Sequence, residues 1–188
     1  MKNNDWLIGF LLVIIIVLSL ALVDSRLSIQ NNVTSIEVQA DQEKIIFAGD
    51  SITDRYDLNY YYNYDNKLVI NSGIGGYKTA NIISRFKNLI EQHNADKLFL
   101  MIGTNDLGAG IDRDQIVENI IQIIAMTKDQ SPKTKIYYET IYPVNRSKRS
   151  PNDKRYNEDI KYINEKMKEY CKNSNVTYID VYSALQDE

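Results

Sequence analysis

The chain has 188 residues, about the length of one ordinary domain, and its 44% hydrophobic and 25% charged residues are typical of folded globular proteins. Lys and Arg number 22 against 25 Asp and Glu. This balance gives no basic excess, so we expect no binding to nucleic acid through phosphate neutralisation. A single cysteine excludes an intrachain disulfide, and a single histidine, His93, excludes most histidine-based metal and catalytic sites.

The N-terminal part of the chain is apolar. After a tail of residues 1–5, residues 6–23 contain no charged side chain. A helix of that length would be about 27 Å long, close to the ~30 Å hydrocarbon core of a bilayer. We therefore expect a single-pass membrane anchor with the domain on the extracytoplasmic side. A signal peptide cleaved near Ala21 is the alternative, and it would release a secreted protein. Residues 24–43 are polar, lack Gly and Pro, and are interpreted as a stalk.

Five short apolar runs predict the strands of a domain over residues 44–188. They cover 44–48, 67–71, 97–102, 135–140 and 177–181. Their residues are apolar on both faces, which is typical of a parallel sheet that is covered on each side.

Amphipathic stretches between these runs predict helices. One covers 79–93, a second covers 112–130 behind a capping-box pattern, and a third begins at Ser150-Pro151 and continues to Cys171. Alternating strands and helices predict a doubly wound α/β fold. In such a fold ligands bind at the carboxyl ends of the strands, so the functional residues are expected there.

Three of the predicted strand ends carry residues suited to acyl transfer. The segments are Gly49-Asp50-Ser51, Gly73-Ile74-Gly75-Gly76 and Gly103-Thr104-Asn105-Asp106. We predict Ser51 as a nucleophile, with the backbone N–H of Gly76 and the amide of Asn105 as donors to an oxyanion. Asp50 and Asp106 are expected to hold the loops by hydrogen bonds.

Other interpretations of this region stay open. Asp50, Asp54, Asp106 and Asp180 lie near one rim of the predicted sheet and suggest a magnesium site. The loop tyrosines Tyr60-Tyr61-Tyr62 and Tyr64 either line a substrate groove or pack against the domain.

The three blocks resemble those of the SGNH/GDSL hydrolase family, and their spacing is similar to the lysophospholipase-like and platelet-activating-factor-acetylhydrolase-like esterases. The resemblance covers about residues 44–188 and includes Tyr142-Pro143-Val144 after the fourth predicted strand and Asp180-Val181-Tyr182 at the fifth. It implies a five-stranded flavodoxin-like fold. It also implies a serine ester hydrolase with Ser51 as nucleophile and Gly76 and Asn105 as oxyanion donors. The substrate would be an acylated lipid or envelope glycan, and no cofactor is implied.

The family's fourth block, an Asp-x-x-His motif beyond the fifth strand, has no counterpart in these 188 residues. His93 is expected roughly 20 Å from the active edge, too far to act as a base. We therefore expect little or no hydrolysis by this chain, which is either shortened relative to an active parent or naturally inactive. A non-catalytic acyl- or glycan-binding module is the alternative. Without the family's closing helix, apolar sheet surface beside 177–181 is expected to be partly uncovered.

Overall fold

The computed structural model describes residues 17–32, 42–62 and 67–186 of the chain. The chain divides into two units, 1–42 and 43–188, and each is described by itself. In the first unit residues 17–32 are helical, so the helix extends into the segment interpreted as a stalk. Among the described residues, no helix combines the length and the apolar character needed to cross a bilayer. Most of the expected anchor, residues 6–16, lies outside the described residues, and the anchor stays a prediction.

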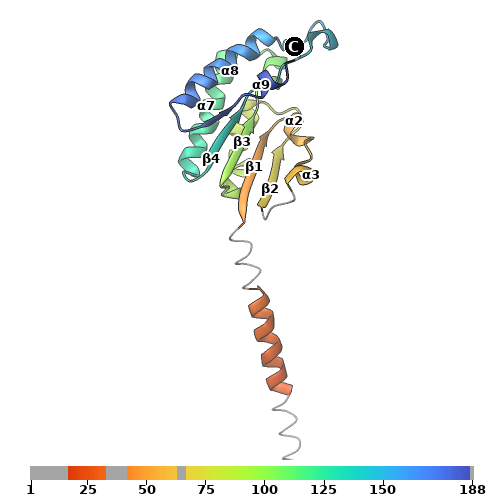
Figure 1. Cartoon of the computed structure of the whole chain (residues 1–188), viewed down its shortest axis with the longest axis vertical. Coiled ribbons are helices and arrows are strands. Elements are labelled where there is room, and N and C mark those ends of the chain that lie inside the picture. The colour runs from red at the N-terminus through yellow and green to blue at the C-terminus, as the bar shows by residue number, and fades with distance from the viewer. Residues whose placement is uncertain (1–16, 33–41, 63–66, 187–188) are drawn as a thin grey trace, which may run out of the picture. The chain divides into compact units, whose positions relative to one another are not determined.

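A five-stranded parallel sheet forms the centre of the second unit (Figure 1). The strands are β1 (Glu43–Gly49), β2 (Lys67–Gly73), β3 (Lys97–Met101), β4 (Lys135–Glu139) and β5 (Thr177–Ile179), arranged in the order β2-β1-β3-β4-β5. The predicted parallel α/β fold is therefore confirmed, and every strand boundary lies within two residues of its expected position. Gly49 pairs with Gly73 on one side and with Met101 on the other, so β1, β2 and β3 end at the same edge.

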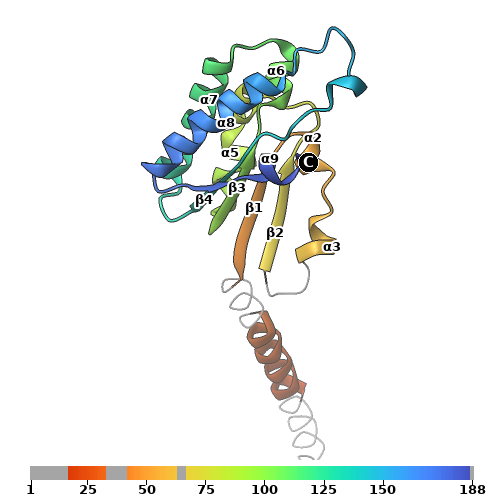
Figure 2. The same ribbon diagram turned by 45° about the horizontal axis from the view of Figure 1, so that its top comes forward.

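Helices and short turns connect the strands. They are α2 (Ser51–Asp54), α3 (Leu58–Tyr62), α4 (Thr79–Ser84), α5 (Phe86–Leu89), η1 (Glu91–His93), α6 (Thr104–Ala109), α7 (Arg113–Gln130), η2 (Arg146–Lys148), α8 (Asn157–Lys172) and α9 (Val181–Ala184). The long helices α7 and α8 lie next to each other against one face of the sheet, and α2 and α3 lie beside β2 (Figures 1 and 2).

The face under α4, α5, α7 and α8 carries the main core. Alternate strand residues such as Ile46, Leu98 and Tyr138 point into it and are fully buried. Four isoleucines of α7 meet them at helical spacing: Ile116, Ile120, Ile123 and Ile124. Each isoleucine removed from water contributes about 1.5–3 kcal/mol, so this layer supplies most of the apolar driving force for folding.

The opposite face is covered only in part. Ile45 and Phe47 of β1 pack with Leu58 of α3, whereas Phe99 of β3 and Tyr137 of β4 are half-buried. The three rings of Phe47, Phe99 and Tyr137 stack in a row, with centroids 4.6 Å apart in both pairs. Beside this row lies an apolar groove of about 410 Å³, bordered by α2, α3, β5 and α9. Ile179 of β5 and Val181 of α9 line one side of this groove, and the expectation of an uncovered surface caused by a missing closing helix stays a prediction.

Two predicted helices differ from the structure. The single helix expected over 79–93 is interrupted at Arg85, whose φ of −117° and ψ of 19° are not helical. The third helix begins at Asn157, not at Ser150-Pro151. Its predicted first turn is instead a loop, because the Asp153 carboxylate accepts a hydrogen bond from the Arg155 N–H, a local turn that competes with helix formation.

Candidate active site

Ser51 is the first residue of α2, directly beyond the end of β1. Asp50 caps this helix, because its Oδ1 accepts a hydrogen bond from the Ile52 N–H at 2.9 Å. A Cβ on Gly49 would lie 2.2 Å from Thr53 Oγ1 and 2.5 Å from the Met101 carbonyl oxygen. Only glycine therefore lets α2 lie so close to the sheet. Ser51 is half-buried, and its hydroxyl makes no hydrogen bond to any residue that the structure describes.

The loop after β2 reaches the same edge. The Ile74 N–H donates to the Gly49 carbonyl at 3.2 Å, and a Cβ on Gly75 would lie 3.9 Å from Ser51 Cβ. Gly76 has a φ of +79°, a left-handed conformation that favours glycine, and a Cβ there would meet open space. Gly76 is exposed, and its N–H donates to no described residue.

Asn105 lies in the first turn of α6, after β3. Its side-chain nitrogen donates to the Tyr77 carbonyl at 3.0 Å and so links this turn to the residue that follows Gly76. Sequence reasoning placed Ser51, Gly76 and Asn105 at three strand ends, and the structure brings those three ends to one edge through short backbone and side-chain contacts.

Asp106 connects the same two loops at a deeper level. Its buried carboxylate accepts hydrogen bonds from the N–H of Thr79 at 3.0 Å and from the Thr79 hydroxyl at 2.6 Å. The Asn119 side chain of α7 donates in turn to the Thr79 hydroxyl at 2.8 Å. The chain Asp106–Thr79–Asn119 therefore fixes the start of α4 against α6 and α7.

Burial dominates the electrostatics of the two site carboxylates. Desolvation raises the pKa of Asp50 above its ordinary value, and the bond from Ile52 and the charge of Arg155 oppose this shift. Asp50 Oδ2 is buried without a hydrogen-bond partner among the described residues. Desolvation also raises the pKa of Asp106, against the bonds from Thr79. Both groups act within the protein framework, because neither is exposed to solvent.

His93 lies at the other end of the sheet. It ends η1, four residues before β3 begins at Lys97, and the β1 residue that pairs with Lys97 is Ile45. Four steps of strand, about 13 Å, separate Lys97 from Met101 at the edge that carries Ser51. A base must approach to about 2.6–3.2 Å of the proton it removes, so His93 is not the base for Ser51.

A magnesium site finds no support in this region. In residues 17–32, 42–62 and 67–186, no group of three or more His, Cys, Asp or Glu side chains could hold a metal ion. Asp180 instead caps α9, because it accepts hydrogen bonds from the backbone and hydroxyl of Ser183.

The loop tyrosines divide between the two roles considered for them. Tyr62 lines the groove on the partly covered face and packs against Phe47, with ring centroids 5.5 Å apart. Tyr60 and Tyr61 are 67% and 55% exposed and contact each other edge to face. Tyr64 lies outside the described residues.

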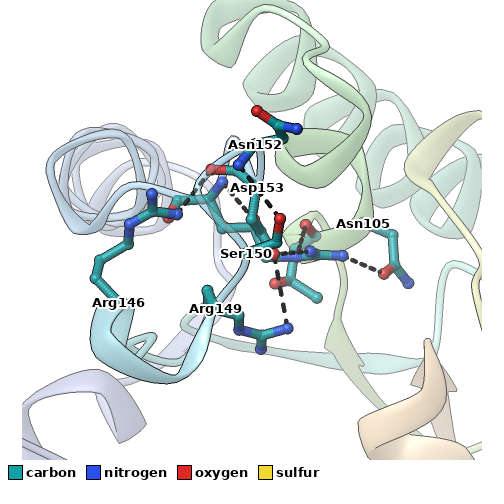
Figure 3. Close-up of polar contacts among 8 residues, drawn as sticks. Asn105, Arg146, Arg149, Ser150, Asn152 and Asp153 are labelled. Carbon is teal, nitrogen blue, oxygen red and sulfur yellow. Dashed lines mark hydrogen bonds and ion pairs between the residues drawn. The ribbon is translucent and has the colours of Figure 1, made fainter.

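Arg155 and Asp153 are site residues that the sequence did not reveal. They belong to the loop before α8, and Figure 3 shows this loop, with Arg146, Arg149 and Asp153, facing Asn105. Arg155 donates to the Thr104 carbonyl at 2.9 Å and to Asn105 Oδ1 at 3.1 Å. A sequence gives no signal for such contacts, because the residues are about fifty positions apart and the pattern before α8 resembles an ordinary helix start.

The chain has detectable relatives. It is similar to an arylesterase of Vibrio mimicus, with 28% identity over 99 residues that cover 46% of this chain and 50% of the relative. The chain therefore spans half the length of this curated relative. A Streptococcus pneumoniae structure described as a platelet activating factor superposes with a TM-score of 0.71 and 26% identity, over 92% of this chain and 84% of the other.

A more distant structure shares the fold. An acetylxylan esterase of Geobacillus stearothermophilus superposes with a TM-score of 0.61 and 20% identity, over 76% of this chain and 77% of the other. Residues 47–188, most of the chain, match the model of the GDSL-like Lipase/Acylhydrolase family. On this match, and on the three loops that meet beside Ser51, the chain belongs to the GDSL-like lipase/acylhydrolase family.

Proposed function

We propose that this chain carries the acyl-transfer half of a serine ester hydrolase site. Ser51 Oγ would attack the carbonyl carbon of an ester, and the N–H of Gly76 and Nδ2 of Asn105 would stabilise the oxyanion that forms. Collapse of this intermediate would break the carbon–oxygen bond to the alcohol, whose oxygen takes up a proton in place of the one that Ser51 loses, and leave an acyl group on Ser51. Water would then hydrolyse this acyl ester to the free acid and restore the Ser51 hydroxyl. The substrate class is an acyl or acetyl ester of a lipid or glycan.

One observation supports this proposal above the others, namely the shared edge of the three loops. The Ile74–Gly49 bond and the Asn105–Tyr77 bond hold the loops after β2 and β3 beside the helix that begins with Ser51. Two amide donors next to an unbonded hydroxyl suit acyl transfer, and each such donor lowers the barrier by about 2.7–4 kcal/mol in a working hydrolase.

No described residue accepts a hydrogen bond from the Ser51 hydroxyl. His93 lies at the far end of the sheet, Asp50 and Asp106 are buried, and Asp180 caps α9. Asp54 of α2 is exposed and its carboxylate lies close to Gly75, but it makes no hydrogen bond to the Ser51 hydroxyl. A serine hydroxyl without a base is a poor nucleophile, so we expect the chain to hydrolyse esters slowly or not at all. Added imidazole, a small free base, should restore part of the reaction at Ser51.

The test is chemical rescue. The 188-residue chain is incubated with a fluorophosphonate probe, with and without imidazole, beside Ser51→Ala and the control Ser84→Ala, which alters an exposed serine of α4. We expect weak labelling that imidazole increases in the unaltered chain and in Ser84→Ala but not in Ser51→Ala. Equal labelling of Ser51→Ala would refute Ser51 as the nucleophile. Strong labelling of the unaltered chain without imidazole would refute the claim that Ser51 lacks a base.

A non-catalytic acyl-binding module is a second candidate, and the groove favours it. This groove of about 410 Å³ is lined mainly by apolar and aromatic side chains of the partly covered face. For this role, a fluorescent fatty acyl ester should bind equally well to Ser51→Ala and to the unaltered chain, and imidazole should have no effect on labelling at Ser51.

A further inference from the structure

We propose that Arg155 is a positioning residue that fixes the orientation of the Asn105 carboxamide at the proposed site. The inference rests on the proposed role of Asn105 as an oxyanion donor. Arg155 itself would not touch the substrate. Its guanidinium would act through Asn105, because it decides which end of the carboxamide faces the loop after β2.

The hydrogen-bond pattern permits only one orientation of that carboxamide. Asn105 Oδ1 accepts from Arg155 Nη2 at 3.1 Å, while Asn105 Nδ2 donates to the Tyr77 carbonyl at 3.0 Å. A flipped amide would direct its NH₂ group at the guanidinium, which has no acceptor, and its oxygen at a carbonyl. The contact with Arg155 therefore keeps the donor end of Asn105 beside Gly76 and Tyr77.

The loop before α8 holds the guanidinium in turn. Asp153 Oδ2 pairs with Arg155 Nη1 at 2.8 Å, and Asp153 Oδ1 accepts from the Arg155 N–H at 2.9 Å. Arg146 donates to the Asp153 carbonyl at 2.7 Å. The Arg155 side chain is only 19% exposed, so the contact with Asn105 belongs to an ordered network and not to a freely moving surface arginine.

Gly108 makes room for this arrangement. A Cβ at Gly108 would lie 2.5 Å from both Cζ and Nη2 of Arg155, so the guanidinium lies directly against the backbone of α6. Glycine inside a helix costs about 1 kcal/mol relative to alanine. The helix bears this cost at Gly108, where the missing side chain leaves the space that Arg155 needs to reach Thr104 and Asn105.

Arg155 also carries a charge that acts on the site, and the test must separate that effect from positioning. Its positive charge opposes the burial-induced rise in the pKa of Asp50. Arg155→Lys keeps the charge but loses the planar fork that contacts several acceptors at once. Gly108→Ala keeps the arginine itself and only displaces its guanidinium from α6.

The experiment compares Arg155→Lys and Gly108→Ala with the control Arg149→Ala. Arg149 pairs with the same Asp153 at 3.8 Å, but its side chain is 44% exposed and makes no hydrogen bond to Asn105. Two properties are measured: the Asn105 side-chain amide signals in a ¹⁵N NMR spectrum, and the saturation kinetics of fluorophosphonate labelling in imidazole.

For Arg155→Lys and Gly108→Ala we expect shifted Asn105 amide signals. We also expect a maximal labelling rate reduced by up to about 100-fold, with little change in probe affinity, because misplacement of about 1 Å can cost that much. The melting temperature of Gly108→Ala should not fall below that of the unaltered chain. A slower labelling rate without a loss of stability would indicate a positioning role, because a merely structural role would lower both. Arg149→Ala should match the unaltered chain.

The two proposals fail in different ways. Unchanged Asn105 amide signals in both variants would overturn the positioning role of Arg155, whatever the labelling rate does. If the unaltered chain is never labelled at Ser51, the proposed function fails. In that case the NMR signals still decide whether Arg155 orients the carboxamide.

Discussion

The buried carboxylate of Asp106 allows a quantitative test of how the two oxyanion loops are held together. Asp106→Ala removes the acceptor for the Thr79 N–H, which is fully buried. It also removes the acceptor at 2.6 Å from the Thr79 hydroxyl. A buried donor without a partner costs about 1–3 kcal/mol, so two donors cost about 2–6 kcal/mol. The hydroxyl can rotate and the burial cost of the carboxylate is relieved, so we expect about 3 kcal/mol.

Urea denaturation of the two variants Asp106→Ala and Asp112→Ala checks this magnitude. Asp112 is an exposed helix cap, where alanine costs about 1 kcal/mol, and it leaves the two loops untouched. The reasoning is refuted if Asp106→Ala lowers the free energy of unfolding by no more than Asp112→Ala. It is also refuted if Asp106→Ala is as stable as the unaltered chain and the backbone amides near Thr79 exchange their hydrogens at an unchanged rate.

The same carboxylate predicts a pH effect whose sign follows from its environment. Burial raises the pKa of Asp106 above its ordinary value of 3.8, so the folded chain binds this proton more tightly than the unfolded chain does. The stabilising contribution of that proton is present at pH below about 3.8 and is lost as pH rises through the folded pKa. In Asp106→Asn, the fall of stability with rising pH in this window should be smaller, and urea midpoints at several pH values measure it.

Two further predictions concern Gly103 and Cys171. Gly103→Ala should lower the free energy of unfolding, measured in urea, by about 2–4 kcal/mol. Gly103 has a φ of +127°, and a Cβ there would lie 2.7 Å from Ile141 Cδ1 in the core. A loss below about 1 kcal/mol would contradict this reasoning. Burial raises the pKa of the Cys171 thiol to about 11. A disulfide reagent at pH 8 should therefore react with this thiol slowly until urea unfolds the chain. Rapid reaction in native buffer would instead show that the thiol is accessible.

The strands could be predicted from the sequence because apolar residues lie on both of their faces, one against the main core and the other on the partly covered face. Leu98 and Leu100 point to the main core while Phe99 faces the other side, and this continuous apolar run is what distinguishes a buried parallel strand. The break at Arg85 could not be predicted in the same way. Ile82 and Phe86 on either side of it keep helical spacing, so the apolar stripe continues through a non-helical residue.

The candidate nucleophile and donors were predictable for a topological reason. In a parallel sheet the residues after each strand arrive at one edge, so Ser51, Gly76 and Asn105 could be grouped without coordinates. The contacts that fix their loops were not predictable. The pairing of Asp106 with Thr79 depends on the packing of α4 against α7, which no local pattern encodes.

Arg155 shows most clearly why the supporting residues of a site escape sequence reasoning. The predicted helix start at Ser150-Pro151 would have placed Arg155 inside a helix, one charged residue among many on a solvated face. The Asp153 turn instead delays α8 to Asn157, and the Asn157 side chain, bonded to both the N–H and the carbonyl of Val144, holds this late start. The six-residue delay is what allows the arginine to leave the helix and lie against Gly108 of α6. A wrong helix boundary and a missed site residue thus have one physical cause, the competition of a carboxylate with the first turn of a helix.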